Sequence, residues 1–173
     1  INGLTEKDLT PYFYPSDEEI EKVGVIGLFL GHYFFWDAKK QLEIVKMHGF
    51  SVKEDGPVEG TYTNYENLDE KMHGLHDYLK YVKYGFGRAT DHACIDIRNN
   101  RITREEGLKL VQGYDGKYPH ISINEFVKYS GITKSEVDSI IDSFTNSMLF
   151  EKDQNGNFKR DSHGNLIRIF DFQ

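Results

Sequence analysis

The densest group of chemically capable side chains is a run of cations between residues 80 and 104 of an acidic chain: Lys80, Lys83, Arg88, Arg98, Arg101 and Arg104. Arginine binds phosphate and carboxylate groups through a planar two-point contact, so this run could hold an anionic ligand. Gly85 and Gly87 would let the backbone approach such a ligand closely. The alternative is a set of internal ion pairs with acids such as Asp91 and Asp96.

Two other combinations of side chains suggest chemistry less strongly. Glu70, His73 and His76 share one side of an expected helix, and Glu-x-x-His can supply two metal ligands. No second such motif occurs in the chain, so no metal site is predicted and a solvated or substrate-facing polar side is favoured. Cys94 lies two positions from His92, but these residues point apart on a helix. A small thiol facing the core is therefore favoured over a nucleophile.

The composition is that of a folded protein of one domain or two small ones, with 173 residues and a formal net charge of -7. The excess of acids argues against nucleic-acid partners and anionic membranes, which attract basic proteins. A single cysteine excludes an intrachain disulfide. The longest apolar run, residues 23–36, is too short and too interrupted by glycine to span a bilayer. We therefore expect a cytoplasmic protein without membrane insertion, and the absence of a starting Met suggests a fragment of a longer one.

The elements that must position the cations are mainly helices. Ser16 caps a helix over residues 17–22, and Asp37 caps another that ends at Met47. Between them, residues 23–33 are almost continuously apolar, which predicts a strand buried in a parallel sheet. The chain offers no parallel partner for this strand, so either another part of the protein supplies one or the segment is a buried helix. Residues 51–64 read as a connecting loop.

Helical spacing is clearest in the middle of the chain, where apolar residues alternate steps of four and three: Leu68, Met72, Leu75, Leu79, Val82 and Phe86. This pattern predicts a helix over residues 66–84. A second helix is expected over residues 88–99. Thr103 and Glu106 form a capping box that begins a third helix, which ends near Gly113.

The last third reads as a helix-turn-helix followed by a hairpin. Helices over residues 122–129 and 134–146 flank a turn, and residues 147–152 would pair with residues 165–172 to give a winged-helix outline. The second helix carries Glu136, Asp138 and Asp142, which would repel DNA, so a packing or interaction appendage is favoured. The predicted domains are residues 1–118, a strand plus a helical substrate-binding half, and residues 119–173.

Three stretches resemble the N-acetyl sugar amidotransferase family of bacterial surface-polysaccharide (LPS) biosynthesis: YENLDEK at residues 65–71, LHDYLKYVKYGFGRATDHACIDIR at 75–98 and TREEGLKLVQGYDG at 103–116. The resemblance extends over about residues 9–119. Members of that family are similar to ATP pyrophosphatases, whose N-terminal α/β half carries a Ser-Gly-Gly-Lys-Asp-Ser phosphate loop. This chain has neither that loop nor the family's N-terminal cysteine cluster. The resemblance therefore implies a mainly α, C-terminal half whose orphan strand completes a sheet in the missing half.

The chemistry implied by the resemblance converts a sugar acetamido group into an acetamidino group. ATP with Mg would activate the amide oxygen in the full-length enzyme, and ammonia would then displace it. This chain alone is expected to bind no cofactor and to be inactive. The substrate would be a sugar nucleotide or an N-acetyl sugar. Ammonia would come from partners similar to the glutaminase and cyclase subunits of imidazole-glycerol-phosphate synthase.

Within these motifs we assign catalytic roles to Asp91 and His92, which would orient the sugar or accept a proton from ammonia. Substrate-binding roles are assigned to Glu66, Asn67, Lys71, Lys83, Arg88 and Arg98. The arginines would hold phosphates. The competing hypothesis is a non-catalytic helical module whose acidic, winged-helix-like tail binds a protein partner.

Overall fold

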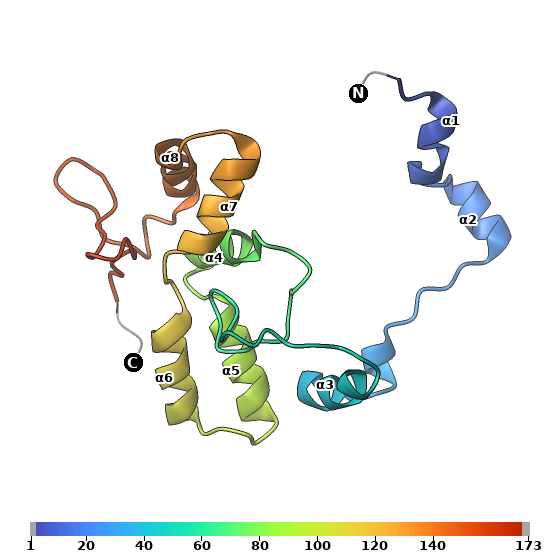
Figure 1. The fold of residues 1–173 in the computed structure, drawn as a ribbon, viewed down its shortest axis with the longest axis horizontal. Helices are drawn as coiled ribbons and strands as arrows, with labels where there is room; N and C mark the ends of the chain where they lie inside the picture. The colour runs from blue at the N-terminus through green and yellow to red at the C-terminus, as the bar shows by residue number, and fades with distance from the viewer. Residues whose placement is uncertain (1–2, 171–173) are drawn as a thin grey trace. The chain divides into compact units, whose positions relative to one another are not determined.

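The computed structural model describes residues 3–170, and its regular structure is helical (Figure 1). The chain divides into two compact units, the first ending at Ile44 and the second beginning at Val45. The described residues contain eight α-helices: α1 (Glu6–Leu9), α2 (Asp17–Val23), α3 (Ala38–Met47), α4 (His73–Tyr84), α5 (Arg88–Arg98), α6 (Arg104–Tyr114), α7 (His120–Ser130) and α8 (Lys134–Phe144). Short 3-10 helices cover Thr10–Tyr12 and Leu30–His32. The predicted mainly α fold class is confirmed at this level.

Two of the sequence-predicted caps begin helices at the expected places in the N-terminal half. Ser16 Oγ accepts a hydrogen bond of 3.3 Å from Glu19 N, and Glu19 returns one to Ser16 N, so α2 begins with a capping box. Asp37 Oδ1 accepts from Lys39 N and Lys40 N at 3.1 and 3.4 Å, which caps α3. Such caps satisfy the backbone N–H groups that the first turn leaves without partners.

The apolar segment between α2 and α3 is neither a strand nor a buried helix. Residues 25–36 have an irregular backbone interrupted by one 3-10 turn, and their large apolar side chains are exposed, with Phe29 at 89%. Neither the strand nor the buried helix expected over residues 23–33 is therefore present in the described chain, and pairing with another part of a longer protein stays a prediction. The physical reason is that a parallel strand needs neighbouring strands to pair its N–H and C=O groups, and no strand lies among residues 3–170.

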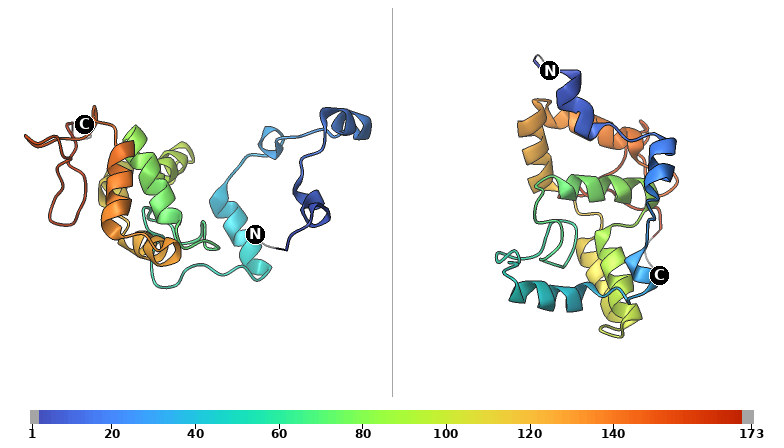
Figure 2. Two further views of the ribbon diagram at one scale, coloured as in Figure 1. Left: turned by 90° about the horizontal axis from the view of Figure 1, so that it is seen from above. Right: turned by 90° about the vertical axis from the view of Figure 1, so that its right-hand side faces the viewer.

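The core of the second unit is built around α4, which packs against α7 and α8 (Figure 2). It consists of the buried residues Leu75, Tyr78, Tyr81, Val82, Tyr118, Ile123, Val137, Ile141, Phe150 and Leu166. The predicted helix over residues 66–84 begins only at His73, because Asn67 adopts a left-handed backbone with φ of 54° and residues 66–72 stay irregular. The core draws residues from both sides of residue 118, and the division there stays a prediction.

The C-terminal segment confirms the helix-turn-helix and corrects the hairpin. Residues 131–133 join α7 to α8, which begins at a capping box formed by Thr133 and Glu136. Phe150 and Arg168 form the antiparallel bridge that the predicted pairing requires, whereas residues 171 and 172 lie outside the described residues. The stretch 153–164 is not an open loop, because it folds back through the further bridges Lys152 to Phe158 and Arg160 to Leu166. The outline of a winged helix therefore consists of single bridges rather than continuous strands.

None of the helices described for this chain is both long and apolar enough to cross a membrane.

Candidate functional site

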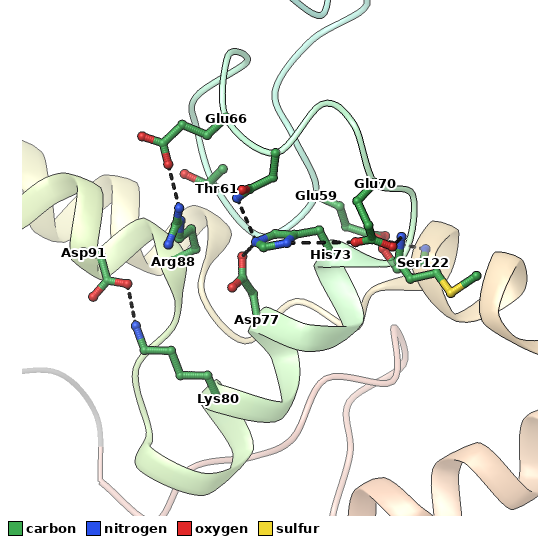
Figure 3. A network of polar contacts seen from close by, with 12 residues as sticks. Glu59, Thr61, Glu66, Glu70, His73, Asp77, Lys80, Arg88, Asp91 and Ser122 are labelled. Carbon is green, nitrogen blue, oxygen red and sulfur yellow. Dashed lines mark hydrogen bonds and ion pairs between the residues drawn. The ribbon is translucent and has the colours of Figure 1, made fainter. Parts of the chain in front are cut away.

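Three of the sequence-predicted site residues form one hydrogen-bonded network in the second unit. Glu66 Oε2 accepts hydrogen bonds of 2.8 Å from Arg88 Nη2 and 2.7 Å from His92 Nε2 (Figure 3 shows the bond from Arg88). His92 is only 6% exposed, and its Nδ1 lies 2.6 Å from the Thr61 hydroxyl. Both ring nitrogens of His92 are therefore engaged by the protein. This arrangement holds the start of α5 against the segment before α4.

The segment over residues 57–66 is a structural part of this site rather than the simple connecting loop expected from its polar composition. Thr61 and Thr63 are buried beside His92. The Tyr62 hydroxyl donates a hydrogen bond of 2.8 Å to Asp96 Oδ2, which fastens the same segment to the middle of α5. Contacts between residues about thirty positions apart leave no local pattern, so sequence reasoning missed all three.

The hydrogen bonds of Glu66 make the free energy of unfolding depend on pH in the acidic range. The hydrogen bond from His92 is the largest cause that lowers the pKa of Glu66 below its ordinary value of 4.5; burial opposes the shift, and the charges of His92 and Arg88 reinforce it. A carboxylate with a lowered pKa in the folded state stabilises above its unfolded pKa, and that contribution is lost as the pH falls through the folded value.

We therefore expect Glu66→Gln to remove part of the fall in the free energy of unfolding below about pH 4.5. Urea unfolding followed by circular dichroism at several pH values measures this slope. Glu105→Gln, which removes an exposed carboxylate from the first turn of α6, is the control. Equal slopes for Glu66→Gln and the unmutated chain would mean that the network adds nothing to acid sensitivity.

The remaining predicted residues lie in different surroundings. Asp91 is paired with Lys80 of α4, as Figure 3 shows. Lys83 Nζ lies 4.5 Å from the centre of the Phe144 ring, and Arg98 is exposed at the end of α5. Internal ion pairs were the alternative to ligand binding for the cations of residues 80–104. Lys80 forms such a pair with Asp91, and Arg88 forms one with Glu66.

Asn67 and Lys71 line a cavity of about 540 Å³ at the N-terminal end of α4. The opposite wall comes from the end of α6 and the start of α7. Glu59 joins the walls, because its carboxylate accepts hydrogen bonds of 2.9 Å from Ile121 N and Ser122 N and 2.6 Å from the Ser122 hydroxyl. Glu59 thereby caps α7 from a position more than sixty residues earlier in the chain.

His73 lines this cavity. Its Nε2 lies 3.1 Å from Asp77 Oδ2 and 2.8 Å from the Asn67 amide nitrogen, and its ring stacks on His76 with the centres 5.6 Å apart. Among residues 3–170, no three His, Cys, Asp or Glu side chains are grouped closely enough to hold a metal ion.

Asp115 is a structural residue of the site that sequence reasoning missed. Its carboxylate accepts hydrogen bonds from Gly87 N at 2.8 Å, Ala89 N at 3.0 Å and the Thr90 hydroxyl at 2.6 Å. Gly87 precedes α5 and has no side chain to cap it, so Asp115 at the end of α6 supplies the cap from outside the helix. The missing cap before Arg88 was the one available signal that a distant acceptor is needed.

Cys94 corrects a sequence-based expectation. It is exposed, whereas the neighbouring Ala93 is buried at 2% exposure. The face of α5 that packs against α6 contains Ala89 and Ala93, and the next residue lies about 100° further round the helix. The thiol therefore points away from the core.

Most of the second unit matches a known protein family. No curated protein matches the sequence significantly. Residues 59–162, more than half of the chain, match the family described as LPS biosynthesis protein WbpG-like, C-terminal domain. WbpG is an N-acetyl sugar amidotransferase, so the resemblance stated from the sequence motifs is confirmed. The segment that carries Glu59, Thr61 and Glu66, together with α4 to α8, thus belongs to the C-terminal domain of the WbpG-like family of LPS biosynthesis proteins, and this chain is a member of that family.

Proposed function

We propose that this chain is the C-terminal part of an ATP-dependent N-acetyl sugar amidotransferase, which converts a sugar acetamido group into an acetamidino group in LPS biosynthesis. The observation that carries the proposal is the family match over residues 59–162, because these residues include the Glu66 network and most of the cavity wall. The substrate would be a sugar nucleotide or another N-acetyl sugar.

The cavity at the start of α4 has the size and chemistry of a sugar site. Its volume of about 540 Å³ falls within the roughly 300–1,000 Å³ of small-molecule pockets. Leu68, Tyr114 and Ile121 supply apolar surface for the sugar ring and the acetamido methyl group. Lys71 and Lys117 also line it, and neither ammonium group has an ion-pair partner in the part of the chain that the structure describes. These two lysines could therefore pair with the phosphate or carboxylate of a bound sugar.

The residues present do not fit the triphosphate of ATP. The sequence contains no glycine-rich phosphate loop of the Ser-Gly-Gly-Lys-Asp-Ser type, and the side chains of Arg88 and Lys80 are held by Glu66 and Asp91. We therefore assign the binding of ATP and Mg to an N-terminal half of a longer protein. Ammonia would come from a separate glutaminase with a cyclase-like partner subunit.

Nitrogen transfer by that longer protein is the test. Supplied with UDP-linked N-acetyl sugars, ATP and isotope-labelled ammonium, it should release pyrophosphate and place the labelled nitrogen in an acetamidino product, which mass spectrometry detects. The 173-residue chain alone should release no pyrophosphate. Pyrophosphate release by this chain, or the absence of labelled product from the longer protein, would contradict the proposal.

A non-catalytic interaction module is the second candidate function, and the exposed apolar side chains of residues 23–36 favour it. Exposed apolar groups on this scale indicate a surface that another protein covers. In the enzyme, the N-terminal half of the longer protein would cover them. The same nitrogen-transfer measurement separates the candidates, because an interaction module would form no acetamidino product under any supply of ammonia.

A further inference from the structure

His73 is oriented by a buried carboxylate. Asp77 follows it by one turn of α4 and is 7% exposed, and Asp77 Oδ2 lies 3.1 Å from His73 Nε2. Among the described residues, His73 is the one partner of this carboxylate. A buried carboxylate needs a donor, so we assign the imidazole proton to Nε2; the Asn67 side-chain amide, whose terminal atom lies 2.8 Å from the same nitrogen, must then present its oxygen there. The other ring nitrogen, Nδ1, is then the one that can accept a proton.

His73 lines the cavity together with a neighbour of each ring nitrogen, Asn67 beside Nε2 and Glu70 beside Nδ1. His73 and Glu70 both line the cavity of about 540 Å³, and His73 Nδ1 lies 3.9 Å from Glu70 Oε2. Asp77 is not part of this wall and lies on the opposite side of the ring, as Figure 3 shows. A carboxylate behind the ring and a second ring nitrogen at the cavity wall together form the arrangement of a histidine general base.

We propose that His73 accepts the proton of the attacking ammonia, with Asp77 as its positioning residue; the inference rests on the proposed function. The ammonia nitrogen forms a bond to the activated acetamido carbon and transfers a proton to His73 Nδ1. The bond from that carbon to the activated oxygen breaks, and the oxygen departs with the electron pair. His73 then returns its proton to the solvent or to the leaving oxygen.

Titratable groups lie on several sides of the His73 ring. Asp77 and Glu70 flank the ring on its two nitrogen sides, and His76 stacks on its face. The other titratable groups of the cavity wall are Lys53, Lys71, Lys117, Glu59, Glu125 and Tyr114. Glu59 is committed to the N-terminus of α7. Glu70 and Asp77 are therefore the two carboxylates nearest the ring.

His92, which the sequence favoured for proton transfer, is placed differently. Its Nε2 contacts Glu66 Oε2, and its Nδ1 contacts the Thr61 hydroxyl, both within 2.7 Å. A proton could reach this ring only after one of these contacts breaks. We therefore infer that His92 fastens α5 to the preceding segment and that His73 contacts the substrate.

The first test uses His73→Gln in the longer protein. The glutamine amide can keep the contact with Asp77 but has no basic nitrogen in place of Nδ1. We expect pyrophosphate release to continue in a single turnover while formation of labelled acetamidino sugar falls at least about a hundredfold, within the range for general-base catalysis. His48→Gln, an exposed histidine outside the cavity wall, is the control and should transfer nitrogen at the normal rate.

The second test uses Asp77→Asn and reads the imidazole directly. In the 173-residue chain, nitrogen NMR should show the proton of His73 on Nε2, and Asp77→Asn should give a mixture of tautomers. In the longer protein, Asp77→Asn should lower kcat by about tenfold and leave KM for the sugar unchanged.

The outcomes separate this inference from the proposed function. Failure of the unmutated longer protein to transfer nitrogen overturns the proposed function, and the inference falls with it. Normal transfer by His73→Gln overturns the role of His73 while the proposed function stands. If His73→Gln does not fold, an unchanged kcat for Asp77→Asn, or a proton on Nδ1 in the spectrum, overturns the inference instead.

Discussion

Asp115→Ala is expected to lower the free energy of unfolding by about 3–5 kcal/mol, because three hydrogen bonds to one carboxylate are lost and each buried donor left unsatisfied costs about 1–3 kcal/mol. The substitution leaves Gly87 N, Ala89 N and the Thr90 hydroxyl without their acceptor, and the two backbone groups are buried. Chemical denaturation followed by circular dichroism measures the change.

The matched variant for this prediction is Asp115→Asn, which keeps one amide oxygen as an acceptor. It should be less destabilising than Asp115→Ala, because the side-chain oxygen can still bind one of the backbone N–H groups. Asp161→Ala, which removes an exposed carboxylate that accepts bonds only within its own turn, is a second control. A loss below about 1 kcal/mol for Asp115→Ala would show that α5 does not need this cap.

Phe150→Ala is expected to cost about 3–5 kcal/mol, the usual range for removing a large buried aromatic side chain. Phe150 is 1% exposed, and its ring centre lies 5.4 Å from that of Tyr81 in α4. Because it joins the C-terminal segment to the central helix, its loss should weaken both together. Unfolding should remain a single transition for residues 45–173 when fluorescence and circular dichroism are compared.

The same experiment examines the predicted boundary at residue 118. An independent domain over residues 119–173 would unfold in a transition of its own, and Phe150→Ala would shift that transition alone. Met148→Ala, at an exposed position two residues earlier, is the control and should change stability by less than about 0.5 kcal/mol. Two separate transitions in the unmutated chain would contradict the shared core.

The parts of the fold that could be predicted from the sequence are those fixed by short-range chemistry. Capping boxes at Ser16, Thr103 and Thr133 involve residues three positions apart, and all three helices begin where expected. The strand expected over residues 23–33 is absent from the described chain. An apolar segment forms a strand only when neighbouring strands can pair with its backbone, and composition does not reveal whether they are present. The helix expected from residue 66 failed because the left-handed backbone at Asn67 delays its start.

The candidate site was predictable in its residue types and not in its contacts. Glu66, Arg88 and His92 were expected near a ligand, and the structure brings them together, although the network occupies both nitrogens of His92. His73 was noted only as part of a Glu-x-x-His pattern, and that pattern gave no indication of its contact with Asp77. Glu59 accepts a hydrogen bond from Ser122 N, more than sixty positions later in the chain, and no local sequence pattern predicts such a contact.

An NMR titration of the 173-residue chain with UDP-N-acetylglucosamine measures whether the cavity at the start of α4 binds an acetamido sugar, as we propose. We expect saturable shifts of the amide signals of Leu68, Tyr114 and Ile121, with a loss of affinity of about tenfold or more in Lys71→Ala. Unchanged signals in this wall, or shifts confined to another cavity lined by Lys134 and Arg160, would contradict the proposed sugar site.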